Sequence, residues 1–143
     1  MHRATSLIAL LALTACTEDP DPAPKTLPVA WVGEHIEVAT ELDLMDYCPG
    51  TLLRLDRHMG ALKDVYEVPA EYVVRYNLFS RPRPTFGCQK GVVACFHDDT
   101  AYATDVFEVH ELVHAVSSIY DGMPRVFEEG AASYWGYAVP ANY

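Results

Sequence analysis

The segment 110–114 (HELVH) limits the possible folds of this chain more than any other feature of its sequence. Two histidines four residues apart lie one turn above each other on an α-helix, so the rings of His110 and His114 can reach one metal ion. Glu111 lies about 100° round such a helix from His110, where its carboxylate can contact a metal-bound water without ligating the metal. Neutral imidazoles suit Zn²⁺, and a catalytic zinc usually has three protein ligands and a water. The motif therefore predicts a helical zinc site with one further ligand elsewhere.

Apolar residues at helical spacing surround the motif and predict a helix over 105–120. The expected core stripe consists of Val106, Val109, Val113, Val116 and Tyr120. Asp105 is expected to cap the start of this helix, with Glu108 as its partner in a capping box. The alternative, two ordinary histidines on a surface or core helix, has less support because these helix signals surround the motif.

A second helix is expected over 124–137, after a turn that contains Gly122 and Pro124. It carries two adjacent glutamates, Glu128 and Glu129, either of which is a candidate third ligand. Glu129 is preferred because it shares a helical face with small residues, which would let the helix approach the active-site helix closely. That predicted face consists of Val126, Glu129, Ser133 and Gly136.

The HELVH segment, followed by a helix with a glutamate and small residues, resembles the gluzincin metallopeptidases, the thermolysin-like group and its minimal relatives. The resemblance covers roughly residues 101–135. It implies one Zn²⁺ per chain, held by His110, His114 and Glu129, and a general base at Glu111. It also implies a zincin-like fold, hydrolysis of peptide bonds and a peptide or protein substrate.

The chain departs from that family's pattern at several positions. Glu108 stands two residues before the first histidine, where zincin helices usually carry an uncharged residue. Ser133 stands four residues after Glu129, where the family often places an acidic residue that orients a histidine. Larger members stabilise the oxyanion with a later His or Tyr. The candidates here are Tyr134, Tyr137, Tyr143 or an upstream group.

The N-terminal segment is expected to be a targeting signal. Residues 6–15 form an apolar run, shorter than the roughly 20 residues that a membrane-spanning helix needs. The run ends in Leu-Thr-Ala before Cys16, which resembles a bacterial lipoprotein signal; the alternative is an ordinary signal peptide. We therefore expect a signal peptide over 1–15, a lipidated, acidic and proline-rich tether over 16–29, and a zincin-like domain over 30–143.

This organisation predicts a protein of the bacterial cell envelope. The lipid on Cys16 would hold it to a membrane, and Thr17 in the next position favours the outer membrane, with the body in the periplasm or at the cell surface. The net charge of −10 argues against nucleic acid and anionic membrane surfaces as partners.

An oxidising envelope also suits a disulfide. Cys88 and Cys95 enclose a short loop with a glycine, so we favour a bond between them. The two pairings that include Cys48 remain open.

The other predicted elements define the fold class. Strands are expected over 35–40, 71–79, 91–96 and 101–104, with an amphipathic helix over 51–65. This order predicts an α+β domain: a small antiparallel or mixed sheet packed on the active-site helix and the glutamate-bearing helix. The strand over 101–104, directly before the active-site helix, is expected to be the edge to which an extended substrate adds.

The remaining histidines have weaker functional support. His97 is explained by a polar turn, His58 by a surface or half-buried position on the first helix, and His35 by the start of a strand.

The alternative to a peptidase is a catalytically inactive envelope lipoprotein that binds zinc or a protein. A third possibility is that the sequence is part of a longer protein. A site that only binds zinc needs no base, so Glu111 favours the enzyme.

Overall fold

The computed structural model describes residues 27–81, 88, 92–120 and 123–138. Five strands form one mixed sheet: β1 (Val29–Val32), β2 (Ile36–Thr40), β3 (Val74–Leu78), β4 (Ala94–His97) and β5 (Thr100–Ala103). Their spatial order is β1-β2-β3-β5-β4. The strands β2, β3 and β5 are parallel, whereas β1 and β4 pair antiparallel to their neighbours. The predicted small mixed sheet is therefore confirmed.

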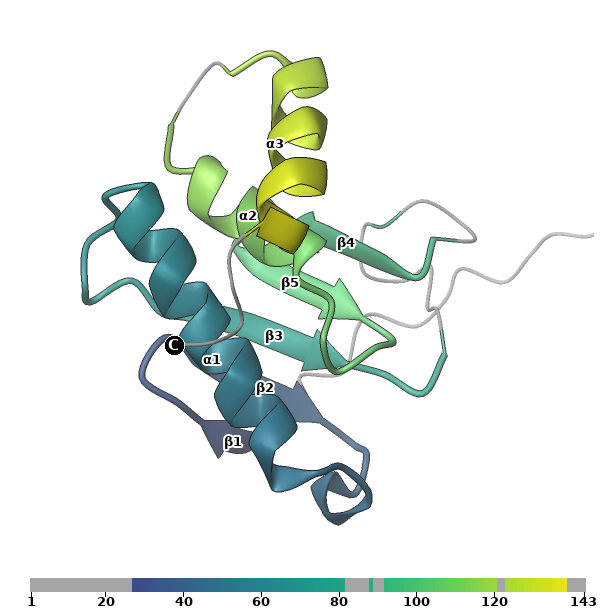
Figure 1. Cartoon of the computed structure of the whole chain (residues 1–143). Coiled ribbons are helices and arrows are strands. Elements are labelled where there is room, and N and C mark those ends of the chain that lie inside the picture. Colours follow the sequence, from purple (N-terminus) through teal and green to yellow (C-terminus); the bar gives the residue numbers. More distant parts are fainter. Residues whose placement is uncertain (1–26, 82–87, 89–91, 121–122, 139–143) are drawn as a thin grey trace, which may run out of the picture.

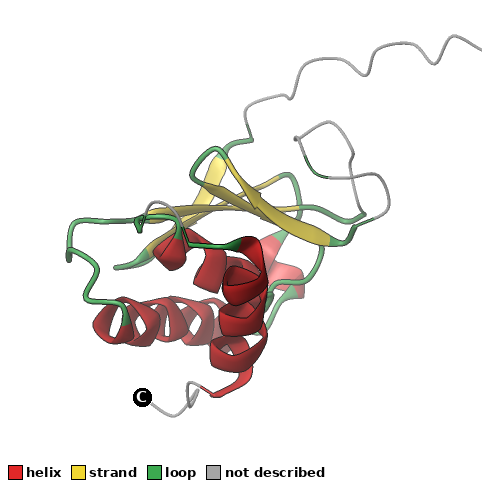
Figure 2. Cartoon of the chain, turned by 90° about the horizontal axis from the view of Figure 1, so that it is seen from above, coloured by secondary structure: helices red, strands yellow, loops and turns green. Residues whose placement is uncertain are grey.

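Three α-helices cover one face of this sheet, which makes the domain α+β as expected (Figure 2). They are α1 (Pro49–Val65), α2 (His110–Ser117) and α3 (Arg125–Ala138), and a short 3-10 helix (Leu44–Asp46) precedes α1. Figure 1 shows α1 lying across the sheet and α3 beside α2. None of these helices is both long and apolar enough to span a bilayer.

The helix α1 confirms the predicted amphipathic pattern. Its apolar residues recur every three or four positions and are buried against the sheet: Leu52, Leu55, Met59 and Leu62. The same core includes the inward side chains of the central strands and the buried face of α2. The sheet therefore fixes the position of α2, the helix that carries the HELVH motif.

The fold starts earlier than predicted. Leu27 is buried beside Ala39 and Phe79 on the opposite face of the sheet, and β1 begins at Val29. Leu27 and Val29 fall within the predicted tether over 16–29. The strand β1 was not predicted, since four residues after a proline carry little periodicity. The predicted signal peptide, Cys16 and the rest of the predicted tether lie outside the described residues.

The prediction of the edge strand is wrong. The strand expected over 101–104 is β5, which lies between β3 and β4, so β4 forms this edge of the sheet. The chain reverses at Asp98 and Asp99, whose positive φ angles of 47° and 56° suit a tight two-residue hairpin. This turn folds β4 back along the outer side of β5. Strand order depends on such non-local pairing, which periodicity does not reveal.

Candidate metal centre

The helix α2 brings the two motif histidines together. His110 is its first residue and His114 lies one turn later, so both rings leave the same face. Their Nε2 atoms are 3.1 Å apart, and the ring centroids are 4.8 Å apart. Burial, together with His110, lowers the pKa of His114. A neutral imidazole is the form that ligates a metal.

The helix α3 supplies a carboxylate to this pair. Glu129 Oε2 lies 3.3 Å from His110 Nε2 and 3.7 Å from His114 Nε2. The structure thus groups Glu129, and not its neighbour Glu128, with both histidines as a set that could hold a metal ion.

Small residues allow α3 to approach α2 so closely. Ala132 is fully buried, and a β-carbon added to Gly136 would lie 3.5 Å from Val109 Cγ2. The predicted close approach is therefore present. The predicted helical face is only partly correct, because Val126 and Ser133 are exposed and Ala132 takes the inner position.

The three candidate ligand atoms lie at distances that suit a single metal ion. A circle through points separated by 3.1, 3.3 and 3.7 Å has a radius of about 2.0 Å. Zinc binds imidazole nitrogen and carboxylate oxygen at about 2.0–2.2 Å, so the three atoms lie close enough together to hold one such ion. Two imidazoles and one carboxylate are also a donor set that a catalytic zinc uses, with the fourth position left for water.

Glu111 lies beside this group without joining it. Its side chain is 7% exposed and lines the same cavity as the two histidines and Glu129. Burial, followed by the charges of Glu108 and Glu129, raises the pKa of Glu111 to about 7. A carboxyl group with a pKa near neutrality can both accept and donate a proton at that pH.

The active-site helix starts five residues later than predicted, so the capping box is wrong. Residues 105–109 form an irregular turn, in which the Asp105 carboxylate accepts a hydrogen bond from the Phe107 N–H at 2.9 Å. Glu108 Oε1 accepts one from the His110 N–H at 3.2 Å. The turn is held instead by Tyr76 of β3, whose hydroxyl donates to the Asp105 carbonyl at 2.7 Å and accepts from the Glu108 N–H at 3.1 Å. This tertiary contact outweighs the local helix signals.

His110, His114 and Glu129 are called the metal group below, because they could hold an ion together. A cavity of about 520 Å³ lies between this group and the edge strand β4. The Thr104 N–H donates to the Val93 carbonyl at 3.1 Å, which places Val93 among the residues that bond to the neighbouring strand. Backbone groups alternate in direction along an antiparallel strand. Those of Ala94 and Phe96 therefore face away from β5, toward the outer edge of the described sheet.

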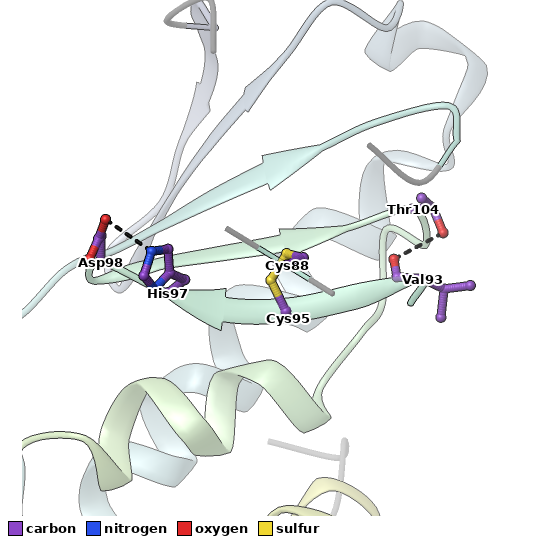
Figure 3. Close-up of a disulfide and its surroundings, with 6 residues drawn as sticks. All are labelled: Cys88, Val93, Cys95, His97, Asp98 and Thr104. Atoms are coloured by element: carbon purple, nitrogen blue, oxygen red, sulfur yellow. Dashed lines mark hydrogen bonds and ion pairs between the residues drawn. A yellow bond between two sulfur atoms is a disulfide. The ribbon is translucent and has the colours of Figure 1, made fainter. Parts of the chain in front are cut away.

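A disulfide lies beside this edge strand, as predicted. Cys88 and Cys95 are bonded, with Cα atoms 5.8 Å apart, and Cys48 is free and exposed. Figure 3 shows the bond next to β4, near the contact between Thr104 and the Val93 carbonyl. The disulfide thus attaches the preceding chain to the strand that forms one wall of the cavity.

His58 differs from its prediction as a surface or half-buried side chain. It is 2% exposed, and neither ring nitrogen has a hydrogen-bond partner among the described residues. Its ring packs against Phe107 with centroids 5.9 Å apart. Burial, with the charge of Arg54, lowers the pKa of His58.

His97 and His35 are not part of the candidate ligand group, although His97 lines the same cavity. His97 ends β4 beside the turn, with Nε2 3.2 Å from Asp98 Oδ2 (Figure 3). The position of His97 directly before the turn at Asp98 and Asp99 agrees with its interpretation as part of a polar turn. The His35 ring packs where a side chain on Gly60 would lie.

The structure gives no support to Tyr134 as the oxyanion group. Its side chain is 63% exposed, packs against Trp135 and does not line the described cavity. The side chain of Tyr137 and all of Tyr143 lie outside the described residues. Arg125, at the start of α3, does line the cavity, and its Nε lies 3.8 Å from Glu129 Oε1. The sequence analysis did not single out Arg125.

No protein-family profile matches this chain, and no match is found among curated proteins or solved structures.

Proposed function

We propose that this chain is a zinc-dependent peptidase of the bacterial envelope. The observation that carries the proposal is the arrangement of four side chains around one cavity. His110, His114 and Glu129 direct three ligand atoms to a common point, and Glu111 lies beside them without being one of the three. A purely structural zinc site has no need of a fourth, buried carboxylate in this place.

Zinc bound by the three ligands would lower the pKa of water and polarise the carbonyl of the scissile bond. Glu111 accepts a proton from the attacking water as the new carbon–oxygen bond forms. It then donates this proton to the leaving nitrogen as the carbon–nitrogen bond breaks. The reaction consumes one water and yields one carboxylic acid and one amine, so Glu111 returns to its starting state.

The edge strand β4 supports a peptide as the substrate. Ala94 and Phe96 present backbone donors and acceptors on the cavity side, and an extended peptide can bind them as an additional strand. This arrangement would place the peptide between β4 and the metal group. A substrate of this kind must be unstructured or locally unfolded near the cleaved bond.

A zinc-binding or protein-binding lipoprotein without activity is the competing function. The exposed position of Tyr134 favours it, because that side chain is too far out to stabilise an oxyanion in the cavity. Arg125 at the rim of the cavity is another cation or donor that could serve this purpose.

The decisive experiment compares the zinc-loaded wild type with Glu111→Gln on an unfolded protein substrate. Glutamine keeps the size and hydrogen bonding of Glu111 but cannot accept a proton at neutral pH. A positioned general base contributes about 10²–10⁴-fold, so activity should fall by that factor while zinc content stays the same. A zinc-loaded wild type without activity on a broad peptide library, or activity that survives Glu111→Gln, would contradict the proposal.

A further inference from the structure

Tyr76 is fully buried in the core, and its hydroxyl makes two hydrogen bonds to the turn before α2. The hydroxyl donates to the Asp105 carbonyl at 2.7 Å and accepts from the Glu108 N–H at 3.1 Å. Burial raises the pKa of Tyr76, so the hydroxyl stays protonated and keeps its role as donor. The buried hydroxyl thus donates one hydrogen bond and accepts another, and both partners belong to the same turn.

The next link runs from Glu108 to His110. The N-cap residue of α2, Val109, makes no side-chain capping hydrogen bond. Glu108 Oε1 instead accepts from the His110 N–H, which is the first N–H of the helix. A carboxylate at this end also interacts favourably with the helix dipole. The backbone of the first ligand is therefore held by Glu108, and Glu108 is held by Tyr76.

The short length of α2 makes its ends important. The helix has eight residues, and isolated helices of this length are not stable in water, so tertiary contacts fix its position. Zinc–ligand distances tolerate only about 0.2 Å of variation. Movement of the first turn would displace His110 relative to His114 and Glu129.

We propose that Tyr76 is a positioning residue of the metal centre, which it serves by fixing the turn that holds Glu108 and His110. The inference rests on the proposed zinc site and extends it to a residue of β3. Tyr76 has no contact with the metal group itself and acts through Glu108.

Tyr72 provides a matched control. Its hydroxyl donates to the Ala115 carbonyl at 3.1 Å, near the other end of α2. Tyr72 lies just before β3 and Tyr76 lies within it. Tyr72→Phe and Tyr76→Phe thus remove the same atom, and each variant loses hydrogen bonding to the region of α2. Only Tyr76 is connected to the first turn, so the two variants separate positioning of His110 from general support of the helix.

The test measures amide hydrogen exchange and zinc affinity in the full chain. In metal-free protein, Tyr76→Phe should accelerate exchange of the His110 N–H, whereas Tyr72→Phe should leave it unchanged. Residues that orient metal ligands through hydrogen bonds typically contribute 10–100-fold to metal affinity, so zinc affinity should fall at least about tenfold in Tyr76→Phe. In Tyr72→Phe it should change by less than about twofold. Urea unfolding confirms that both variants are folded.

A second pair of variants keeps the test informative if Tyr76→Phe does not fold. Glu108→Gln retains an oxygen acceptor and should preserve most of the zinc affinity, whereas Glu108→Ala should lose it as Tyr76→Phe does. Equal losses in the two tyrosine variants, or unchanged exchange at His110, would overturn the inference while leaving the zinc site intact. A wild-type chain that binds no zinc would overturn the site and the inference together.

Discussion

Gly33 lies so close to the Asp56 carboxylate that a side chain at position 33 would overlap with it. This carboxylate comes from α1 and accepts hydrogen bonds from three consecutive backbone N–H groups between β1 and β2. They belong to Glu34, His35 and Ile36, at 3.2, 2.8 and 3.1 Å. The contact joins α1 to the hairpin at the β1 edge of the sheet, whereas the cavity with the candidate metal ligands lies beside β4 at the other edge.

This contact predicts that Gly33→Ala destabilises the protein, because the new β-carbon must displace Asp56 from its three donors. Hydrogen bonds to charged groups contribute about 1.5–3 kcal/mol each, so the free energy of unfolding should fall by at least about 2 kcal/mol. Gly50→Ala is the control, since a β-carbon there meets no atom within 4 Å. Urea denaturation should show this variant unchanged or slightly more stable. Equal stabilities for the two variants would contradict the close contact between Gly33 and the Asp56 carboxylate.

The metal centre predicts different effects for two neighbouring glutamates. Glu129→Gln removes a charged ligand and should lower zinc affinity strongly, as should His114→Ala. Glu128→Gln changes the same charge one position away and should have little effect, since Glu128 is not part of the ligand group. Elemental analysis and chelator competition measure the outcome. Full zinc occupancy in Glu129→Gln at low free zinc would exclude Glu129 as a ligand.

His58 predicts a pH dependence of stability that is independent of the metal. Its pKa is lowered in the folded state, so the unfolded state binds the proton more tightly. The resulting stability is fully present above the unfolded value of about 6.5 and is lost as the pH falls below it toward the folded pKa. His58→Leu should reduce this loss in urea titrations at pH 7.5, 6 and 5 with chelator present. An unchanged pH profile in His58→Leu would refute the prediction.

Loss of the disulfide between Cys88 and Cys95 should affect peptidase activity more strongly than it affects zinc binding. Cys95 belongs to β4, whereas the metal group lies on α2 and α3. Replacing Cys88 and Cys95 with serine should loosen the edge strand and raise the KM for a peptide substrate. Zinc affinity should remain close to that of the wild type. The free Cys48→Ser variant is the control and should change neither quantity. A parallel loss of zinc affinity would show that β4 supports the ligands directly.

Cys16 predicts a lipid anchor. Replacing it with serine should release the protein from membranes or block its processing, since the apolar run of the N-terminal segment is too short to span a bilayer. Cell fractionation with Thr17→Ser as the control provides the measurement. Unchanged membrane retention of Cys16→Ser would contradict the anchor.

The parts of this fold that were predictable depend on local patterns. The spacing of His110 and His114 and the apolar stripe of α1 follow from helical geometry alone. The preference for Glu129 came from the small residues that share its helical face, and Gly136 does approach α2 closely. These features need no knowledge of which strands are neighbours.

The parts that were not predictable depend on distant residues. The start of α2 is set by Tyr76, 32 positions before Glu108, so the local capping signals of Asp105 were misleading. The edge position of β4 follows from strand order, and the burial of His58 from packing against Phe107. Each of these contacts brings together segments that the sequence separates, and no periodicity encodes them.

The position of α3 means that a bound metal ion would also affect how this helix is attached to the domain. Among the described elements, α3 has its main contact with α2, and the inner side of that contact includes Ala132 and Gly136, which bury little apolar area. Its outer side leaves Val126, Phe127 and Tyr134 exposed. An ion shared by the two helices would therefore act as a cross-link, worth about 2.7 kcal/mol at a free concentration one hundred times its Kd. The attachment of α3 to α2 would then depend on the concentration of free zinc around the protein.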